Sequence, residues 1–168
     1  FGYFLYAFGP TVALLRDEQG YTRSVASLHG TAMAVGSVVV GLTATHFVRW
    51  MGRCAMLRLG SALMAGGILI YTGFDPLPLA LLGIFLAACG GTFAMVGVNA
   101  FLPAHHGAAS ARAMSEAHGL GATMGLLGPL AVGGGVAIGW GWRPGLIVTC
   151  LGLAVLELLR GRRLADFD

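Results

Sequence analysis

GLLGPLAVGGG, residues 125–135, contains five glycines and one proline and lies in a segment with no charged residue between Glu116 and Arg143. In a helix exposed to water, each interior glycine costs about 1 kcal/mol relative to alanine, and a proline costs about 3 kcal/mol. A lipid bilayer changes this balance, because backbone amides released from a helix would find no water there. Small residues also let helices approach closely in lipid. The stretch therefore predicts a transmembrane helix in which glycine and proline serve close packing, bending or both.

The composition of the whole chain supports the same conclusion. Of its 168 residues, 10% are charged and 57% are hydrophobic, and the mean hydropathy is +0.80. Soluble domains carry about 25% charged residues. The basic residues are all arginines in short connecting segments without interleaved aromatic residues, which argues against a nucleic-acid partner. The three cysteines are far apart and no histidine or cysteine spacing is typical of a metal site, so neither a metal nor another cofactor is expected.

Six mainly apolar segments alternate with short charged or Pro/Gly-containing turns. They cover about residues 1–15, 24–47, 54–73, 77–101, 113–139 and 143–159. Each interior segment is long enough to cross a bilayer. Because the connectors are short, consecutive helices are expected to be antiparallel neighbours. The expected fold class is an all-α membrane protein, a single bundle of six transmembrane helices surrounded by the lipid bilayer.

The distribution of arginines orients this bundle. Six crossings place both termini and the second and fourth connectors on one side. That side holds Arg49, Arg53, Arg58, Arg112, Arg160, Arg162 and Arg163, whereas the other side holds Arg16, Arg23 and Arg143. Cytoplasmic loops of membrane proteins carry the excess of positive residues. The sequence therefore predicts a multi-pass protein of the cell (inner) membrane with both termini cytoplasmic.

Small residues form stripes at helical spacing on three of the segments. The stripes are Ala32 and Gly36; Gly83, Ala87 and Gly91; and Gly121, Gly125, Pro129 and Gly133. Lipid gives helices no hydrophobic reason to associate, so close packing depends on such residues. Close contact between helices and bending of the helices explain these stripes equally well.

Two stretches resemble a known family when placed in a six-helix unit with both ends inside. GLTATHFVRWMGRC, residues 41–54, follows the second segment, and GLLGPLAVGG lies in the fifth. Together they resemble the N-terminal half of a major facilitator superfamily transporter. The loop is similar to that family's glycine- and arginine-rich element, which it matches at Gly41, Arg49, Gly52 and Arg53.

The match to the family is incomplete. Thr45 and His46 stand where the family has an aspartate and an arginine, so the usual salt bridge at this helix end does not form in its normal way. In the fifth segment, the spacing from Gly128 and Pro129 to Gly133 is one residue too long for the glycine-proline motif of proton-coupled exporters. An arginine that many drug antiporters carry in the fourth segment is also missing.

The resemblance implies roles for particular residues. Segments one and four would line a central cavity, two and five would face a second six-helix half, and three and six would lie toward lipid. Inner gating and helix bending are expected at Gly41, Arg49, Gly52, Arg53, Gly125, Gly128, Pro129 and Gly133. Substrate contact is expected at Tyr3, Tyr6, Thr11 and Asn99, which suits an amphipathic organic solute; equally, a tyrosine hydroxyl in lipid can simply bind a neighbouring backbone.

Ionisable residues inside a bilayer are costly and indicate function by default. His29, near the outer end of the second segment, is a candidate for proton coupling, the alternative being a neutral histidine hydrogen-bonded to a neighbouring helix. Glu116 and His118, at the cytoplasmic start of the fifth segment, are further candidates. Arg112 precedes Glu116 by four residues, so a structural ion pair is the alternative for that carboxylate.

These observations favour one half of a secondary active transporter, with proton-coupled export of a small amphipathic organic solute. An uptake symporter, a facilitator and a non-transporting sensor or assembly subunit are the alternatives. Enzymatic activity is not expected: an intramembrane serine protease needs a Gly-x-Ser-Gly turn that LGSAL around Ser61 lacks. The second half would come from a further portion of a longer chain, a separate chain or a second copy.

Overall fold

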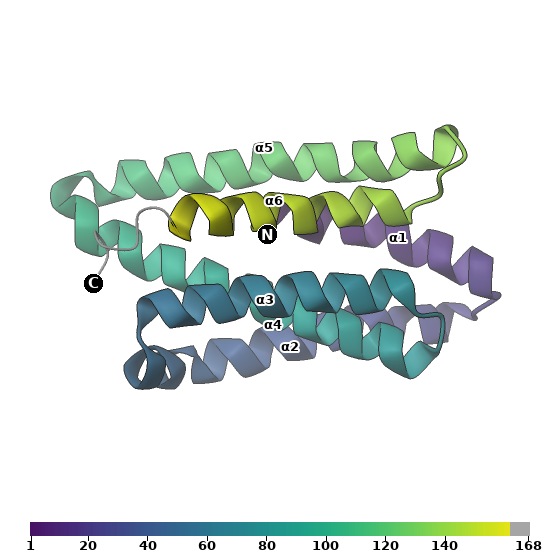
Figure 1. The fold of residues 1–168 in the computed structure, drawn as a ribbon, viewed down its shortest axis with the longest axis horizontal. Coiled ribbons are helices and arrows are strands. Elements are labelled where there is room, and N and C mark those ends of the chain that lie inside the picture. The colour runs from purple at the N-terminus through teal and green to yellow at the C-terminus, as the bar shows by residue number, and fades with distance from the viewer. Residues whose placement is uncertain (162–168) are drawn as a thin grey trace.

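The computed structural model describes residues 1–161, which are helical apart from short turns (Figure 1). The helices are α1 (Gly2–Gln19), α2 (Arg23–Met51), α3 (Arg53–Gly73), α4 (Leu77–His106), α5 (Ser110–Ala137) and α6 (Arg143–Gly161), and a short 3-10 turn (Gly107–Ala109) joins α4 to α5. The helices lie along the long axis of the molecule and consecutive ones run in opposite directions. The expected all-helical class is confirmed.

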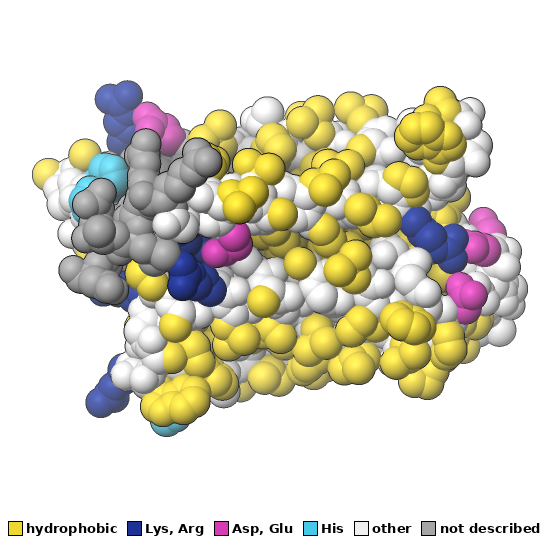
Figure 2. All heavy atoms as spheres, in the orientation of Figure 1, with side chains coloured by type: hydrophobic (Ala, Val, Ile, Leu, Met, Phe, Trp, Pro, Cys, Tyr) yellow, Lys and Arg dark blue, Asp and Glu magenta, His cyan; other side chains and the backbone are white. Residues whose placement is uncertain are grey.

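Four stretches of the described chain are long and apolar enough to cross a membrane. They are Arg23–Met51, Arg53–Gly73, Leu77–Ala137 and Arg143–Gly161, of which the third contains both α4 and α5. The helix α1 is not among them, and it carries three charged residues in its last turn, Arg16, Asp17 and Glu18. Apolar side chains cover the middle of the molecule, whereas charged side chains gather at its two ends (Figure 2). These features are compatible with a multi-pass membrane protein; six crossings stay a prediction.

Glycines bring α3 and α4 into backbone contact at two levels. A methyl group added to Gly83 would lie 2.7 Å from the carbonyl oxygen of Gly67, and one added to Gly60 would lie 2.9 Å from that of Gly90. Atoms cannot approach so closely, so only glycine fits these positions. Gly60 and Gly67 are seven residues apart, as are Gly83 and Gly90, which places one pair directly above the other between antiparallel helices.

The same packing joins α5 to α1 and α2 to α4. A methyl group on Gly128 would lie 2.6 Å from the carbonyl oxygen of Tyr3, and one on Gly36 would lie 2.6 Å from that of Phe85. Side chains from five helices and the α5–α6 turn fill the core: Phe4, Ala7, Phe8, Leu15, Met64, Ile68, Tyr71, Ala80, Ile84, Ala87, Val132, Trp142 and Leu146. The close-packing interpretation of the small residues is confirmed at these interfaces.

Candidate functional site

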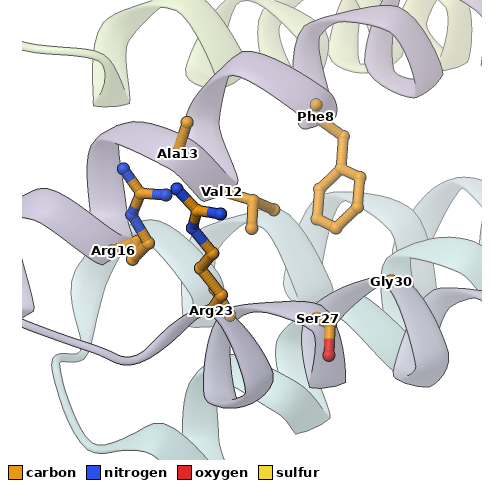
Figure 3. A pocket seen from close by; sticks show the side chains of 9 residues that line it. Phe8, Val12, Ala13, Arg16, Arg23, Ser27 and Gly30 are labelled. Carbon is orange, nitrogen blue, oxygen red and sulfur yellow. The ribbon is translucent and has the colours of Figure 1, made fainter.

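A cleft of about 500 Å³ opens between α1 and α2 at the end of the molecule that holds the α1–α2 turn (Figure 3). We name this end the outer end and the opposite one the inner end, after the orientation that the arginines predict. Its lining consists of Phe8, Gly9, Val12, Ala13 and Arg16 from α1 and Arg23, Ala26, Ser27 and Gly30 from α2. Gly9 and Gly30 both have open space where a side chain would be, so no side chain from these positions fills the cleft. Ligand pockets in proteins measure about 300 to 1,000 Å³, so the cleft has room for a small organic molecule.

The four residues expected to contact substrate do not line this cleft. The hydroxyl of Tyr3 donates a 2.6 Å hydrogen bond to the carbonyl oxygen of Gly145 on α6. Thr11 is fully buried and donates a 2.7 Å hydrogen bond to the carbonyl oxygen of Phe8. Tyr6 is 55% exposed, and Asn99 is half-buried toward the inner end of α4. Two of these hydroxyls are therefore engaged by the fold, and a role of the four in substrate contact stays a prediction.

The expected inner gate lies at the α2–α3 turn. Gly52 has φ 83°, a conformation that favours glycine, and its N–H donates to the carbonyl oxygen of Val48 to end α2. Arg49 and Arg53 flank this turn, are exposed, and make no ion pair with any other residue of 1–161. Gly41 is exposed with open space around it. The turn thus presents, at the inner end of the molecule, two guanidinium groups that have no ion-pair partner among residues 1–161.

The glycines of the glycine-proline element in α5 lie in two different environments. Gly125 and Gly128 are buried, the first against the ring of Tyr6 and the second against the backbone of α1. Gly133 is exposed and has open space where a side chain would be. The helix continues through Pro129 as far as Ala137. Close packing explains Gly125 and Gly128 fully, whereas Gly133 has no such role within the chain.

His29 is fully buried beside the cleft rather than in it. Its ring lies 5.9 Å from the ring of Tyr71 on α3, in an edge-on arrangement. Its Nδ1 is 3.2 Å from the carbonyl oxygen of Ala26, which belongs to the same helix. The expected alternative, a hydrogen bond to a neighbouring helix, is therefore wrong. Its Nε2 is buried and has no hydrogen-bond partner among the described residues, which is a costly arrangement for a purely structural histidine.

The carboxylate of Glu116 forms the ion pair that its spacing predicts. The Nε of Arg112 lies 2.7 Å from Oε1 of Glu116, and the two side chains are 84% and 61% exposed. His118 is exposed on the same turn of α5. These groups lie on the surface at the inner end of the molecule, whereas the cleft lies at the outer end.

A cluster at the outer end joins three segments of the chain, and sequence reasoning did not identify it. Arg143 donates hydrogen bonds to Glu18 (2.8 Å), Asp75 (3.4 Å) and the carbonyl oxygen of Thr72 (3.1 Å). The indole N–H of Trp142 also donates to Glu18, at 2.9 Å. Figure 2 shows basic and acidic side chains side by side at this end of the molecule. The available signal was that Glu18, Asp75 and Arg143 belong to the first, third and fifth connectors, which six crossings would place on one side.

The electrostatics of this cluster centre on Glu18. The hydrogen bond from Trp142, together with a hydrogen bond and the positive charge from Arg143, lowers the pKa of the Glu18 carboxyl below its ordinary value, against a smaller opposing effect of burial. Glu18 therefore stays ionised and holds α1 against the α5–α6 turn.

No protein-family model, curated protein or solved structure matches the chain.

Proposed function

We propose that this chain is one half of a major facilitator-type secondary transporter that exports a small amphipathic organic solute by alternating access. The observation that carries the proposal is the cleft of about 500 Å³ between α1 and α2, together with the buried His29, which lies on the same stretch of α2 as the lining residues. Ala26 and Gly30 line the cleft on either side of His29. A solute pocket adjoining an ionisable group in a mainly apolar helix is the arrangement that coupling of solute to proton requires.

Exposed glycines on α2 and α5 support a second six-helix half. Gly41 on α2, and Gly133 and Gly134 on α5, are exposed and have open space around them. A surface glycine has no packing advantage where it faces lipid, whereas it lets a neighbouring helix approach the backbone closely. We therefore assign these two faces to the contact with the second half. We assign α6 to lipid, because its exposed glycine, Gly152, lies among exposed leucines.

Proton coupling is assigned to His29. Histidine is the side chain that changes charge closest to neutral pH. The unpartnered Nε2 gives the proton a place to bind without breaking an existing hydrogen bond. A positive charge at this buried position would favour a conformation that exposes the ring, which links protonation to opening of the cleft.

Transport by protein reconstituted in vesicles tests the proposal. The protein is expected to move amphipathic solutes from a test panel against their gradient when a proton gradient is imposed. The H29Q variant is expected to exchange solute between two equal pools but to lose proton-driven accumulation. The matched control is H46Q, since His46 is an exposed histidine on the same helix.

Two outcomes contradict the proposal. Absence of any solute movement by the wild-type protein, with or without a gradient, favours a non-transporting sensor or assembly subunit. Solute movement that does not depend on the proton gradient favours a facilitator. Proton-driven accumulation by H29Q favours another coupling residue.

A further inference from the structure

We infer that the α1–α2 cleft binds an amphipathic organic anion, with its acidic group between Arg16 and Arg23 and its apolar part against Phe8 and Val12. This inference deepens the proposed function, on which it rests for the statement that the bound molecule is the transported solute. Binding itself is a separate property of the cleft and is measured without transport.

The charges at the mouth of the cleft favour an anion. Both guanidinium groups lie at the same end of the cleft (Figure 3). Arg16 binds Oδ1 of the neighbouring Asp17 through Nε and Nη2, at 2.9 and 2.6 Å. Arg23 has neither an ion pair nor a side-chain hydrogen bond to any residue in the described part of the chain. Two positive and one negative side chain leave an excess of one positive charge, which repels a cation.

The neighbouring acids balance the charge at this end of the molecule, but none of them contacts Arg23. Glu18 and Asp75, at the same end of the molecule, both bind Arg143. Asp17 is occupied by Arg16. A carboxylate, sulfonate or phosphate entering the mouth therefore meets one guanidinium with all its donors free, and guanidinium groups form strong charge-assisted hydrogen bonds with such groups.

The rest of the cleft suits an apolar tail or ring. Gly30 lies seven residues beyond Arg23 along α2, which is about 10 Å at the helical rise per residue. Over that depth the wall is formed by Phe8, Val12 and Ala26, with the hydroxyl of Ser27 as a single polar group. The ring of Phe8 points into the space between the helices (Figure 3) and closes the end of the cleft away from the arginines, with the 5% of its surface that the core leaves exposed. Charge at the mouth and apolar surface below it define an amphipathic monoanion.

Two sources supply this chemistry, a free organic anion and the headgroup of an anionic lipid. Equilibrium binding of naphthalene-2-sulfonate to protein in phosphatidylcholine nanodiscs tests the site, with empty nanodiscs subtracted. Saturable binding of the sulfonate, and none of the cation 2-naphthylmethylammonium, is expected. Adding phosphatidylglycerol to the nanodiscs separates the sources: competition identifies a lipid headgroup as the natural occupant, and no competition identifies a free solute.

Two variants and two controls connect binding to the cleft. R23Q is expected to weaken binding about tenfold or more, because a hydrogen bond to a charged group contributes about that much. G30L is expected to abolish it by filling the cleft, where open space accepts the side chain. The controls are R58Q, whose arginine lies beside Glu157 at the inner end, and G152L, which has similar open space on α6.

Two results would overturn the inference. One is equal binding of the sulfonate and the cation. The other is unchanged sulfonate binding in both R23Q and G30L, provided that these variants melt at the wild-type temperature. Solute export by a protein that fails this binding test would leave the proposed function standing with its solute site elsewhere. Binding without export would overturn the proposed function and leave the anion site.

Discussion

The indole Nε1–H of Trp142 donates a 2.9 Å hydrogen bond to Oε2 of Glu18, joining two residues 124 positions apart in the chain. The guanidinium of Arg143 lies over the indole ring, 4.8 Å from its centroid, and binds the other oxygen of the same carboxylate. Trp142 is 97% covered because its ring also packs against Tyr71, with centroids 5.4 Å apart. One carboxylate thus fixes the outer end of α1 to the α5–α6 turn, beside the mouth of the cleft.

Stability at acid pH is the first prediction. Because the pKa of Glu18 is lowered in the folded protein, its carboxylate stabilises the fold above pH 4.5, the ordinary value, and this stabilisation is lost as the pH falls through the lower folded value. Melting temperatures in detergent, measured from neutral pH downward, are expected to fall more steeply below pH 4.5 for the wild type than for E18Q. Parallel curves for the two proteins contradict this role of Glu18.

The glycine contacts of α3 give the second prediction. Gly66 and Gly67 are neighbours, but a methyl group on Gly67 would collide with the backbone of α4 at Ala87, whereas one on Gly66 meets nothing within 4 Å. G67A is expected to destabilise the protein by about 1 to 3 kcal/mol, the usual cost of overpacking. G66A is expected to leave stability unchanged or raised by up to about 1 kcal/mol through helix propensity. Unfolding in a denaturing detergent measures both, and equal stability of the two variants would refute the assigned contact.

Composition was enough to predict the helical class, because the sequence has few charges and long apolar runs. The helix ends were predicted less well. The fourth apolar segment was expected at 77–101, but α4 extends to His106 and stops where Gly107 takes φ 49°. Hydropathy indicates where a helix leaves the lipid, whereas the helix itself ends where its backbone hydrogen bonds end. These two positions need not coincide.

The candidate site was predicted only in part. The Arg112–Glu116 pair was confirmed, because both residues lie on one helix at a fixed spacing. The Glu18–Arg143 pair was missed, because it depends on how distant turns lie beside one another, which spacing along the chain does not encode. The cleft was missed for the same reason: Gly9 and Gly30 create it only when α1 and α2 are placed face to face.

The two surroundings of the α5 glycines give the third prediction. G128A places a methyl group 2.6 Å from the carbonyl oxygen of Tyr3 and is expected to lower thermal stability. G133L enters open space and is expected to keep wild-type stability but to reduce solute export to background, because it obstructs the proposed contact with the second half. Its control, G152L, is expected to keep both properties. Full export by stable G133L would remove Gly133 from that contact.

The surface pair at the inner end gives the last prediction. Exposed i,i+4 ion pairs contribute about 0.3 to 0.5 kcal/mol, and the side chains of Arg112 and Glu116 are mostly exposed. E116Q is therefore expected to change the free energy of unfolding by no more than this amount and to keep proton-driven export, since an exposed carboxylate far from the cleft has no direct contact with solute. H118Q, which alters an exposed side chain of the same helix turn, is expected to behave likewise. If either variant retains solute exchange but loses proton-driven accumulation, the coupling site lies at the inner end of α5, and His29 loses the role assigned to it.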